Sequence, residues 1–294
     1  MTATPIRAGT PNYLVLTPDY RDTSGGIMFL HKLADELCQL GENALIWPLG
    51  FTKGQPEWWA WARNGFKMLP GTASRLARPE DLHANSIVIY PEIVHGNPLG
   101  ASNVARWLMF PPSLRGTADS FGPKDLYFKV SDFSDDRRLS GGAQLLQLFS
   151  IHPAYSDRGN PDRRGTCYML RKQGKKQWLH DPAKDIGLDE LGHEEIAHHF
   201  NTCERFICYD EATMYAQFAA LCGCLSIVVP GIYQDRATWS AQRPIAKYGV
   251  AFGLEDTAHA IATRHHLSNH LRQLEVEGKE TVLRFVERTK REFG

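Results

Sequence analysis

The sequence has no excess of charge of either sign and no long apolar run. Its 33 basic and 33 acidic residues cancel, so the net charge gives no case for a nucleic-acid-binding protein. No stretch reaches the roughly 18 apolar residues that a transmembrane helix needs. The first residues, MTATPIRAGTPNY, lack the apolar core of a signal peptide. We therefore expect a protein of the cytoplasm.

Cysteine is scarce, with six scattered residues in 294, most of them in apolar segments. This pattern is typical of buried thiols in a reducing compartment. Cys222 and Cys224 could form a metal or redox pair, but no second pair follows at the spacing of a zinc site. We expect structural cysteines and no metal site.

Motifs of several common enzyme classes are missing as well. The sequence contains no G-x-x-x-x-G-K-[ST] phosphate loop and no G-x-S-x-G nucleophile turn. Ser24-Gly25-Gly26 lacks the third glycine of a dinucleotide-binding fingerprint. The segment that begins at His193 is not an H-E-x-x-H zinc motif, because Ala197 stands where the second histidine is needed. Its acidic start and histidine-rich end instead suit the dipole of a helix.

Alternating strand and helix patterns run through both halves of the chain. Short β-branched runs without polar residues are typical of parallel sheets buried on both faces. The expected strands are 13–16, 44–48, 86–90, 125–130 and 144–150, then 166–170, 206–208, 225–229 and 250–252. The expected helices are 27–40, one that starts at 189 or 193 and ends at 200, 212–223, 257–274 and 279–293. We predict an α/β protein with two doubly wound, mostly parallel sheets that carry helices on both faces, joined by a linker at 153–164.

The most informative segment is FICYDEATMYAQFAALCGCLSIVVP, residues 206–230. It predicts a strand, a polar turn, a helix, a tight turn and a second strand. Tyr209, Asp210 and Glu211 follow the first strand, and Thr213 stands at the expected start of the helix. Unpaired N–H groups and the helix dipole stabilise an anion at such a place. We expect a small-molecule site here.

Two other segments could contribute to the same site. Arg171 and Lys172 close a strand of the second half, where adjacent cations commonly neutralise phosphates, although surface pairs of this kind are also common. Gly25 and Gly26 follow the first strand of the chain. They could permit a tight turn, or they could let the backbone approach a diphosphate or a sugar. Both interpretations stay open.

Candidate bases follow two strands of the first half. Glu92 and His95 lie just beyond the strand at 86–90, and ligands of open α/β sheets bind beyond the carboxyl ends of strands. A carboxylate or imidazole at that place could take a proton. The alternative role of Glu92 is to cap the next helix. Asp19, beyond the first strand, is the further candidate.

An aromatic cluster, Trp58-Trp59-Ala60-Trp61, is followed by basic residues at 63, 67, 75 and 78. A tryptophan-rich, locally basic surface suits a membrane interface or a site where sugars stack. A hydrophobic lid packed on the rest of the protein is the alternative. A peripheral association with the inner face of the membrane is therefore a second expectation for location, beside a freely cytoplasmic protein.

Together these segments resemble the GT-B glycosyltransferases, enzymes of two facing Rossmann-like domains, and in particular those of bacterial surface-polysaccharide assembly. The resemblance covers most of the chain. It rests on Ser24-Gly25-Gly26 with the helix after it, on YPEIVHGNP, on Arg171-Lys172, and on YDEAT with ALCGC and SIVVP. It implies an acceptor-side domain at 1–155, a nucleotide-sugar-binding domain at 156–278, and a last helix at 279–294 that packs back on the first domain.

The resemblance also implies roles for the candidate residues. The expected donor-binding residues are Gly25, Gly26, Arg171, Lys172, Tyr209, Asp210, Glu211 and Thr213, and the expected catalytic candidates are Glu92, His95 and Asp19. The chain has no Asp-x-Asp pair, which suits a transferase that works without a metal or any other cofactor. The implied reaction is hexosyl or deoxyhexosyl transfer from a nucleotide diphosphate sugar to a glycan or a lipid-linked acceptor.

One departure from the family pattern bears on this reading. Many retaining members carry two glutamates around the donor helix, and alignment on Gly223 puts Asp210 at the first position and Phe218 at the second. Ribose recognition and the stereochemistry of transfer are thereby left open. The missing carboxylate favours a second hypothesis, a non-catalytic protein that binds nucleotide sugars or glycans. A nucleotide-sugar epimerase is the third.

Overall fold

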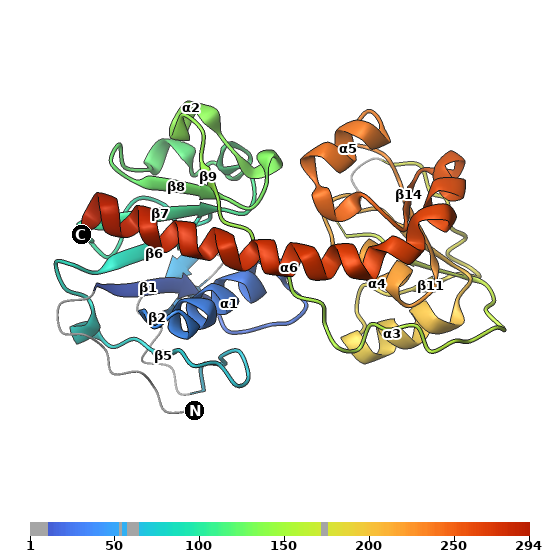
Figure 1. The fold of residues 1–294 in the computed structure, drawn as a ribbon, viewed down its shortest axis with the longest axis horizontal. Coiled ribbons are helices and arrows are strands. Elements are labelled where there is room, and N and C mark those ends of the chain that lie inside the picture. The colour runs from blue at the N-terminus through green and yellow to red at the C-terminus, as the bar shows by residue number, and fades with distance from the viewer. Residues whose placement is uncertain (1–10, 53–54, 58–64, 172–175) are drawn as a thin grey trace. The chain divides into compact units, whose positions relative to one another are not determined.

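The computed structural model describes residues 11–52, 55–57, 65–171 and 176–294. The chain divides into two compact units (Figure 1). Unit 1 comprises Met1–Leu148 and Val276–Gly294, and unit 2 comprises Phe149–Glu275. The sequence placed the divisions at 155/156 and 278/279. Each unit is built around a parallel sheet, so the expected α/β class is confirmed.

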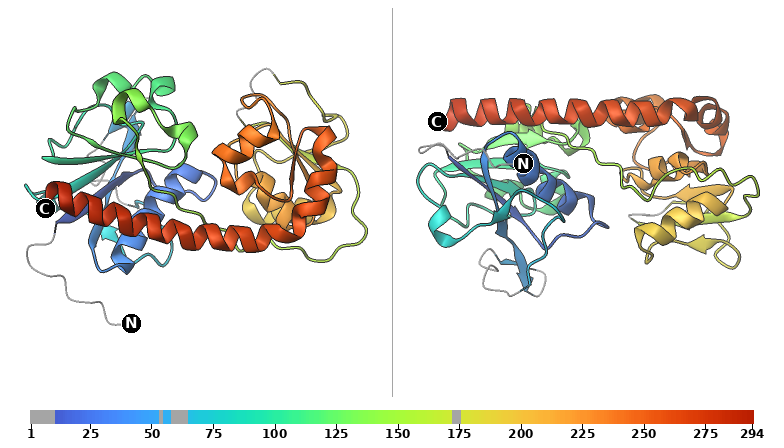
Figure 2. Two further views of the ribbon diagram at one scale, coloured as in Figure 1. Left: turned by 45° about the horizontal axis from the view of Figure 1, so that its top comes forward. Right: turned by 60° about the horizontal axis from the view of Figure 1, so that its bottom comes forward.

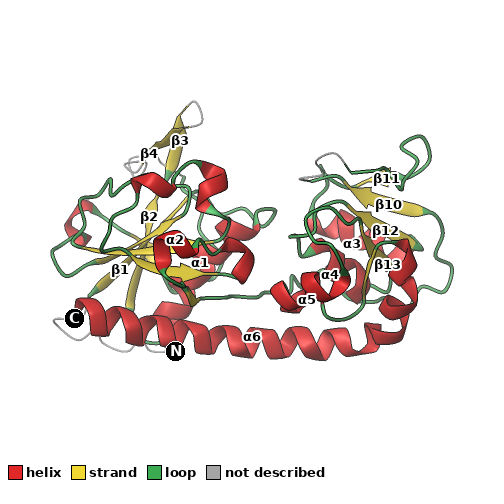
Figure 3. Ribbon diagram, turned by 90° about the horizontal axis from the view of Figure 1, so that it is seen from above, coloured by secondary structure: helices red, strands yellow, loops and turns green. Residues whose placement is uncertain are grey.

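The sheet of unit 1 has seven strands in the order β5-β2-β1-β6-β7-β8-β9, and every neighbouring pair is parallel. The strands are β1 Asn12–Thr17, β2 Asn43–Pro48, β5 Arg75–Leu76, β6 Ile87–Pro91, β7 Asn103–Leu108, β8 Leu126–Lys129 and β9 Gln144–Leu145. An antiparallel hairpin, β3 Gly50–Thr52 with β4 Gln55–Glu57, is added to this unit (Figure 3). The chain first builds the sheet outward from β1 in one direction and then continues from β6 in the other. The boundary between β1 and β6 is therefore a topological switch point, the usual place for a ligand.

Helices cover one face of this sheet. Helix α1 (Gly25–Gln39) and the C-terminal part of α6 (Thr257–Phe293) pack there, with Leu33 and Phe285 fully buried between them and the strands. The other face, with Leu14 and Tyr90, is covered in the described residues by loops and short 3-10 turns. In the described residues of this unit, the helices expected on the second face are not found. The described parts of the segments that join β2 to β6 and β6 to β7 contain no α-helix.

The local sequence of helix α1 determines where the helix ends. Leu30, Leu33 and Leu37 recur at helical spacing and are buried. Gly41 ends the helix with a φ of 83°, while the Glu42 amide bonds the Leu37 carbonyl at 3.0 Å. The sequence predicts a start at Ile27, but the helix starts at Gly25. The two glycines thus form its first turn and do not belong to the loop before it.

The sheet of unit 2 has five parallel strands in the order β11-β10-β12-β13-β14. The strands are β10 Thr166–Met169, β11 Ile186–Gly187, β12 Arg205–Cys208, β13 Leu225–Val228 and β14 Val250–Phe252. Here the order reverses between β10 and β12, which gives this sheet its own switch point.

Helices again cover one face of the unit 2 sheet. These are α3 (His193–Thr202), α4 (Tyr215–Leu221), α5 (Arg236–Gln242) and the part of α6 that carries Leu267, Leu271 and Leu274. On the other face, Ile207 and Ile227 pack against Leu179 of the connection from β10 to β11 and against Ala260 of α6. Residues 176–185 of that connection form turns and contain no helix. Here too the predicted second layer of helices is replaced largely by loop.

The remaining regular elements of the described residues are short. They are α2 Arg137–Ser140 and the 3-10 helices Pro79–Asp81, Pro112–Arg115, Ala118–Ser120, Asp132–Ser134, Pro244–Ala246 and Leu254–Asp256. The strand predicted at 144–150 is much shorter than expected, since β9 ends at Leu145.

The last helix differs most from the prediction. The sequence indicates two helices with a break at 275–278, but α6 is one helix of 37 residues (Figure 2). Gly278 lies inside it, where an added Cβ would stand 2.9 Å from the Gln147 carbonyl oxygen. Thr281 bonds both the amide and the carbonyl of Gln147, at 2.9 and 3.1 Å. The glycine is therefore a point of close packing and does not break the helix. No helix of the described residues is long and apolar enough to cross a membrane.

Candidate functional site

The carboxyl edge of the unit 2 sheet brings together the residues that follow β10 and β12. These strands are neighbours, with Met169 opposite Cys208, so Leu170–Arg171 and Tyr209–Glu211 leave the sheet side by side. The amides of Leu170 and Arg171 donate to the two carboxylate oxygens of Asp189, at 2.9 and 3.1 Å. Asp189 therefore fixes the backbone of the strand end that carries Arg171. The switch point of the sheet, between β10 and β12, lies at this edge.

Arg171 itself lies over an aromatic ring. Its guanidinium carbon is 4.8 Å from the centroid of Tyr215, the first residue of α4. The structure thus places this predicted donor-binding cation beside the start of the predicted donor helix. Lys172, its predicted companion, lies outside the described residues.

The turn from β12 to α4 is organised by two side chains of the predicted site. The Asp210 carboxylate accepts the Ala212 amide at 2.9 Å, and the Thr213 hydroxyl accepts the Tyr215 amide at 3.3 Å. Both are local turns of the kind that Asp and Thr favour. The sequence predicts a helix from Ala212, but α4 begins at Tyr215 and leaves Thr213 in the turn before it.

Tyr209 and Glu211 point into the protein. The Tyr209 hydroxyl accepts the Leu179 amide and shares a hydrogen bond with Nδ1 of His180, both at 2.7 Å. Burial raises the pKa of Tyr209 above its ordinary value. The Glu211 carboxylate, with a fully buried side chain, accepts backbone amides of the loop after β13 and the ammonium of Lys176. Direct donor contact by these two residues stays a prediction.

A cluster of rings beside Arg171 was missed by the sequence analysis. The Tyr155 hydroxyl lies 2.5 Å from Nδ1 of His193, whose ring stacks on His152 with centroids 4.1 Å apart and planes 12° apart. Tyr215 also stacks on His193, with centroids 5.8 Å apart. Because Tyr155 comes from the expected linker and His193 begins α3, no local pattern joins them. Two adjacent imidazoles are also ligands that a transition metal uses.

The carboxyl edge of unit 1 gathers the other predicted residues. Glu92 directly follows β6 and is 4% exposed, and its carboxylate accepts the Met109 amide at 3.2 Å. An added Cβ on Gly26 would stand 3.6 Å from the methyl carbon of Met109. The start of α1 and the ends of β6 and β7 therefore meet at one place. Asp19, exposed beyond β1, accepts the Lys67 amide at 2.7 Å.

His95 is exposed on a loop that a buried arginine holds in place. Arg106, fully buried, donates to the carbonyls of Val94 and Gly96 and to the Asp125 carboxylate. The Val94 and Asp125 contacts measure 3.0 and 2.7 Å. Neither the burial of Arg106 nor its contact with this loop could be read from the sequence.

A second unpredicted residue, His31 of α1, supports the first loop. Its Nε2 lies 2.9 Å from the carbonyl oxygen of Pro18, and the side chain is 1% exposed. Burial lowers the pKa of His31 below its ordinary value of 6.5, so the neutral ring is favoured. With Nε2 as the donor, this imidazole ties α1 to the loop that carries Asp19.

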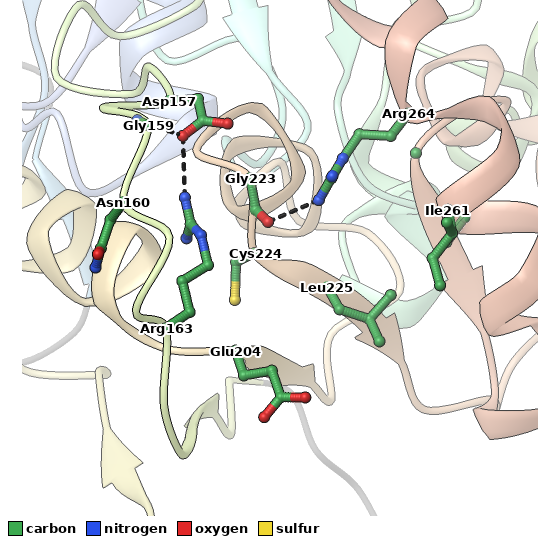
Figure 4. A pocket seen from close by; sticks show the side chains of 12 residues that line it. Asp157, Gly159, Asn160, Arg163, Glu204, Gly223, Cys224, Leu225, Ile261 and Arg264 are labelled. Carbon is green, nitrogen blue, oxygen red and sulfur yellow. Dashed lines mark hydrogen bonds and ion pairs between the residues drawn. The ribbon is translucent and has the colours of Figure 1, made fainter.

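A cavity of about 490 Å³ lies at the opposite, amino-terminal edge of the unit 2 sheet (Figure 4). Arg163 reaches across its wall to donate to the carbonyls of Phe200 and Cys222, and it pairs with Asp157 at 3.0 Å. Those carbonyls belong to the C-terminal ends of α3 and α4, which helices leave unpaired. Arg163 therefore has a structural role, and no predicted site residue lines this cavity.

The fold and the two edges define the class of the protein: α/β, with parallel sheets whose strand orders are those of doubly wound nucleotide-binding folds. No protein-family model matches the chain. No curated protein matches it. Among solved structures, the chain is similar to sucrose-phosphate synthase from Thermosynechococcus elongatus, at 10% identity and a TM-score of 0.39, over 93% of this chain and 94% of that one. A likeness at this TM-score is too slight to identify a fold or a function.

Proposed function

We propose that this protein is a glycosyltransferase. In this proposal it moves a hexosyl or deoxyhexosyl group from a nucleotide diphosphate sugar to a glycan or a lipid-linked acceptor, without a metal. The observation that carries the proposal is the placement of the predicted residues. In both units, the predicted residues that the structure describes lie at the carboxyl edge, around the point where the strand order of the parallel sheet reverses.

In the proposed donor site, Arg171 and Lys172 neutralise the diphosphate. Asp210 and Thr213 shape the turn beside it, and Tyr209 and Glu211 support that turn. Arg243, which donates to the Ala212 carbonyl at 2.6 Å, adds a cation that the sequence analysis missed. Charge develops on the diphosphate as the sugar departs, so fixed cations lower the barrier. Removing one such donor costs about 3 kcal/mol of barrier, or on the order of a hundredfold in rate.

In the proposed acceptor site, a group on unit 1 takes the proton of the acceptor hydroxyl. Glu92 is the first candidate and His95 and Asp19 are the others. The first turn of α1, with Gly25 and Gly26, carries no acidic side chain and no side-chain cap, so its amides suit an anionic group of the substrate. The proposed location is the cytoplasm or the inner membrane face. The tryptophan cluster at 58–61 lies outside the described residues.

The test is release of free nucleotide from UDP-, GDP- and dTDP-sugars in excess EDTA, with and without an acceptor glycan. Release that depends on the acceptor supports a metal-independent transferase. Activity lost in EDTA and restored by Mg²⁺ or Mn²⁺ contradicts the metal-independent part. A donor sugar that changes configuration without nucleotide release would indicate an epimerase.

A non-catalytic nucleotide-sugar or glycan-binding protein is the second candidate function. Phe218 favours it, because this residue replaces the second expected carboxylate and is packed in the core. Tight nucleotide binding without release under every condition would support it.

A further inference from the structure

Lys176 is buried where three loops of the unit 2 site meet. Its side chain is 9% exposed, and its ammonium donates to the carbonyls of Tyr209 and Val229 and to the Glu211 carboxylate, at 2.8, 2.7 and 2.8 Å. A lysine has three N–H donors, so all of them are used. Tyr209 directly follows β12 and Val229 directly follows β13. Lys176, five positions after Arg171, thus ties the loop after β10 to the ends of β12 and β13.

Glu211 completes the contact from the other side. Its side chain is fully buried, and one carboxylate oxygen accepts the amides of Gly231 and Ile232 at 3.0 Å and that of Tyr233 at 3.3 Å. Three consecutive backbone amides and an ammonium are an arrangement that binds anions. The protein fills this arrangement with its own carboxylate, so Glu211 fixes the loop after β13 as Lys176 fixes the loop after β10.

Gly231 shows that the backbone is fitted closely to this pair. An added Cβ there would stand 2.3 Å from Cε of Lys176 and 3.2 Å from a carboxylate oxygen of Glu211. Any other residue at this position would displace the Lys176 side chain. Gly231 is not among the glycines with a positive φ, so its backbone conformation does not by itself require glycine. The glycine is therefore required for space.

We propose that Lys176 and Glu211 are positioning residues for the donor site. This inference rests on the proposed function. The buried ion pair holds the chain at Lys176 against the loops after β12 and β13, and donor affinity depends on that contact. Glu211 thus acts through Lys176 and the loop amides, and the proposal replaces the direct donor contact that the sequence predicts for it.

The experiment compares Glu211→Gln, Lys176→Met and the double variant with the wild-type protein. Lys184→Met is the matched control, because Lys184 pairs with Asp181 in the same connection but is 81% exposed. The readouts are melting temperature, affinity for UDP, GDP and dTDP by calorimetry, and hydrogen exchange of the amides within 177–182, where Pro182 has none, and at 231–233.

Each single variant leaves a buried charge without its partner, so we expect both to melt at lower temperature. In the double variant no charge is unpaired, and the glutamine oxygen can still accept the loop amides. We expect its melting temperature to return close to that of the wild type. In the double variant, hydrogen exchange at 177–182 should still be at least about tenfold faster than in the wild type. Its nucleotide affinity should be at least about tenfold weaker, because residue 176 no longer donates to the loops after β12 and β13.

If the double variant recovers stability, exchange protection and nucleotide affinity together, the pair is only structural and the proposal is overturned. Unchanged exchange at 177–182 in all three variants overturns it as well. If the wild type binds none of the three nucleotides, the proposed function fails, and the exchange measurement still decides whether the pair fixes the loop.

Discussion

The ring of Phe218 stacks on the ring of Tyr155, with centroids 4.3 Å apart and planes 10° apart. Phe218 is 4% exposed and belongs to the core of unit 2. The family resemblance places a glutamate at this position in many retaining enzymes. Here the position supports Tyr155, whose hydroxyl bonds His193. Any recognition of a donor by this protein therefore has to use other residues.

Phe218→Glu is expected to destabilise the protein and to leave nucleotide affinity no better. The change removes a buried ring and buries a carboxylate without a partner, which costs on the order of 3–5 kcal/mol or more. Chemical denaturation measures the stability and calorimetry the affinity. Phe218→Leu, which stays apolar, should lose less. A stable Phe218→Glu protein with tighter nucleotide-sugar binding would show that this position faces the ligand.

Arg171→Ala is expected to weaken nucleotide binding with the fold intact. A charge-assisted hydrogen bond contributes about 1.5–3 kcal/mol, so affinity should fall roughly tenfold to a hundredfold. The contact of Arg171 with the Tyr215 ring is a small term in stability, on the order of 0.5–1 kcal/mol. Calorimetry with the best-binding nucleotide is the measurement. Arg205→Ala, an exposed arginine at the other end of the same sheet, is the control.

Much of the fold could be read from the sequence because strands and helices leave local patterns. The strand at Val250–Phe252 is confirmed residue for residue, and β13 differs from its prediction by one residue. The helix break at 275–278 was wrong because a glycine that normally weakens a helix serves a distant contact with Gln147. That contact spans about half of the chain and leaves no local trace.

The candidate site also contains some residues that the sequence could reveal and others that it could not. Residues directly after strands, such as Arg171 and Glu92, could be found because a strand end is visible in the sequence and its edge of the sheet follows from topology. Tyr155 and His193 were missed, since they meet only when the linker folds against α3. Lys176 was not among the predicted site residues, because its burial against Glu211 depends on three loops at once.

His31 is expected to make stability depend on pH in the weakly acidic range. Burial lowers its pKa in the folded state, so between 6.5 and that lower value the unfolded chain binds a proton that the folded protein does not. Stability should therefore fall as the pH drops through this window and level off below it. Each unit of pKa difference corresponds to about 1.4 kcal/mol.

The measurement is the free energy of unfolding of wild type and His31→Gln between about pH 7.5 and pH 5. Glutamine can still donate to the Pro18 carbonyl but does not titrate. The difference in the free energy of unfolding between the two proteins should therefore become smaller as the pH falls. His83→Gln, which changes an exposed histidine, is the control. Parallel profiles for wild type and His31→Gln would mean that His31 does not contribute.

Gly278→Ala is expected to destabilise the protein, although alanine favours a helix over glycine by about 1 kcal/mol. The new methyl group would stand 2.9 Å from the backbone oxygen of Gln147, and α6 and the segment after β9 would have to move apart. Overpacking of this kind typically costs about 1–3 kcal/mol. Thermal and chemical denaturation measure it, with the exposed Arg284→Ala as a control expected to stay within about 0.5 kcal/mol. A more stable Gly278→Ala protein would show that α6 has room at this point.

Glu92→Gln is expected to keep nucleotide affinity and to lower turnover by roughly a hundred- to ten-thousandfold, the range of a general base. The amide has the shape of the carboxylate and can still accept the Met109 amide, so stability should change little. Asp19→Asn is the matched comparison, since Asp19 also follows a strand at the same switch point. Turnover is measured as acceptor-dependent nucleotide release.

The outcome depends on the stereochemistry of transfer, which NMR of the product's anomeric proton determines. An inverting enzyme needs a base, and loss of turnover in Glu92→Gln with an active Asp19→Asn protein then assigns that role to Glu92. The reverse pattern moves it to the loop after β1, which His31 holds in place. If the sugar retains its configuration, no such base is required, and a near-normal Glu92→Gln enzyme would follow from the mechanism itself.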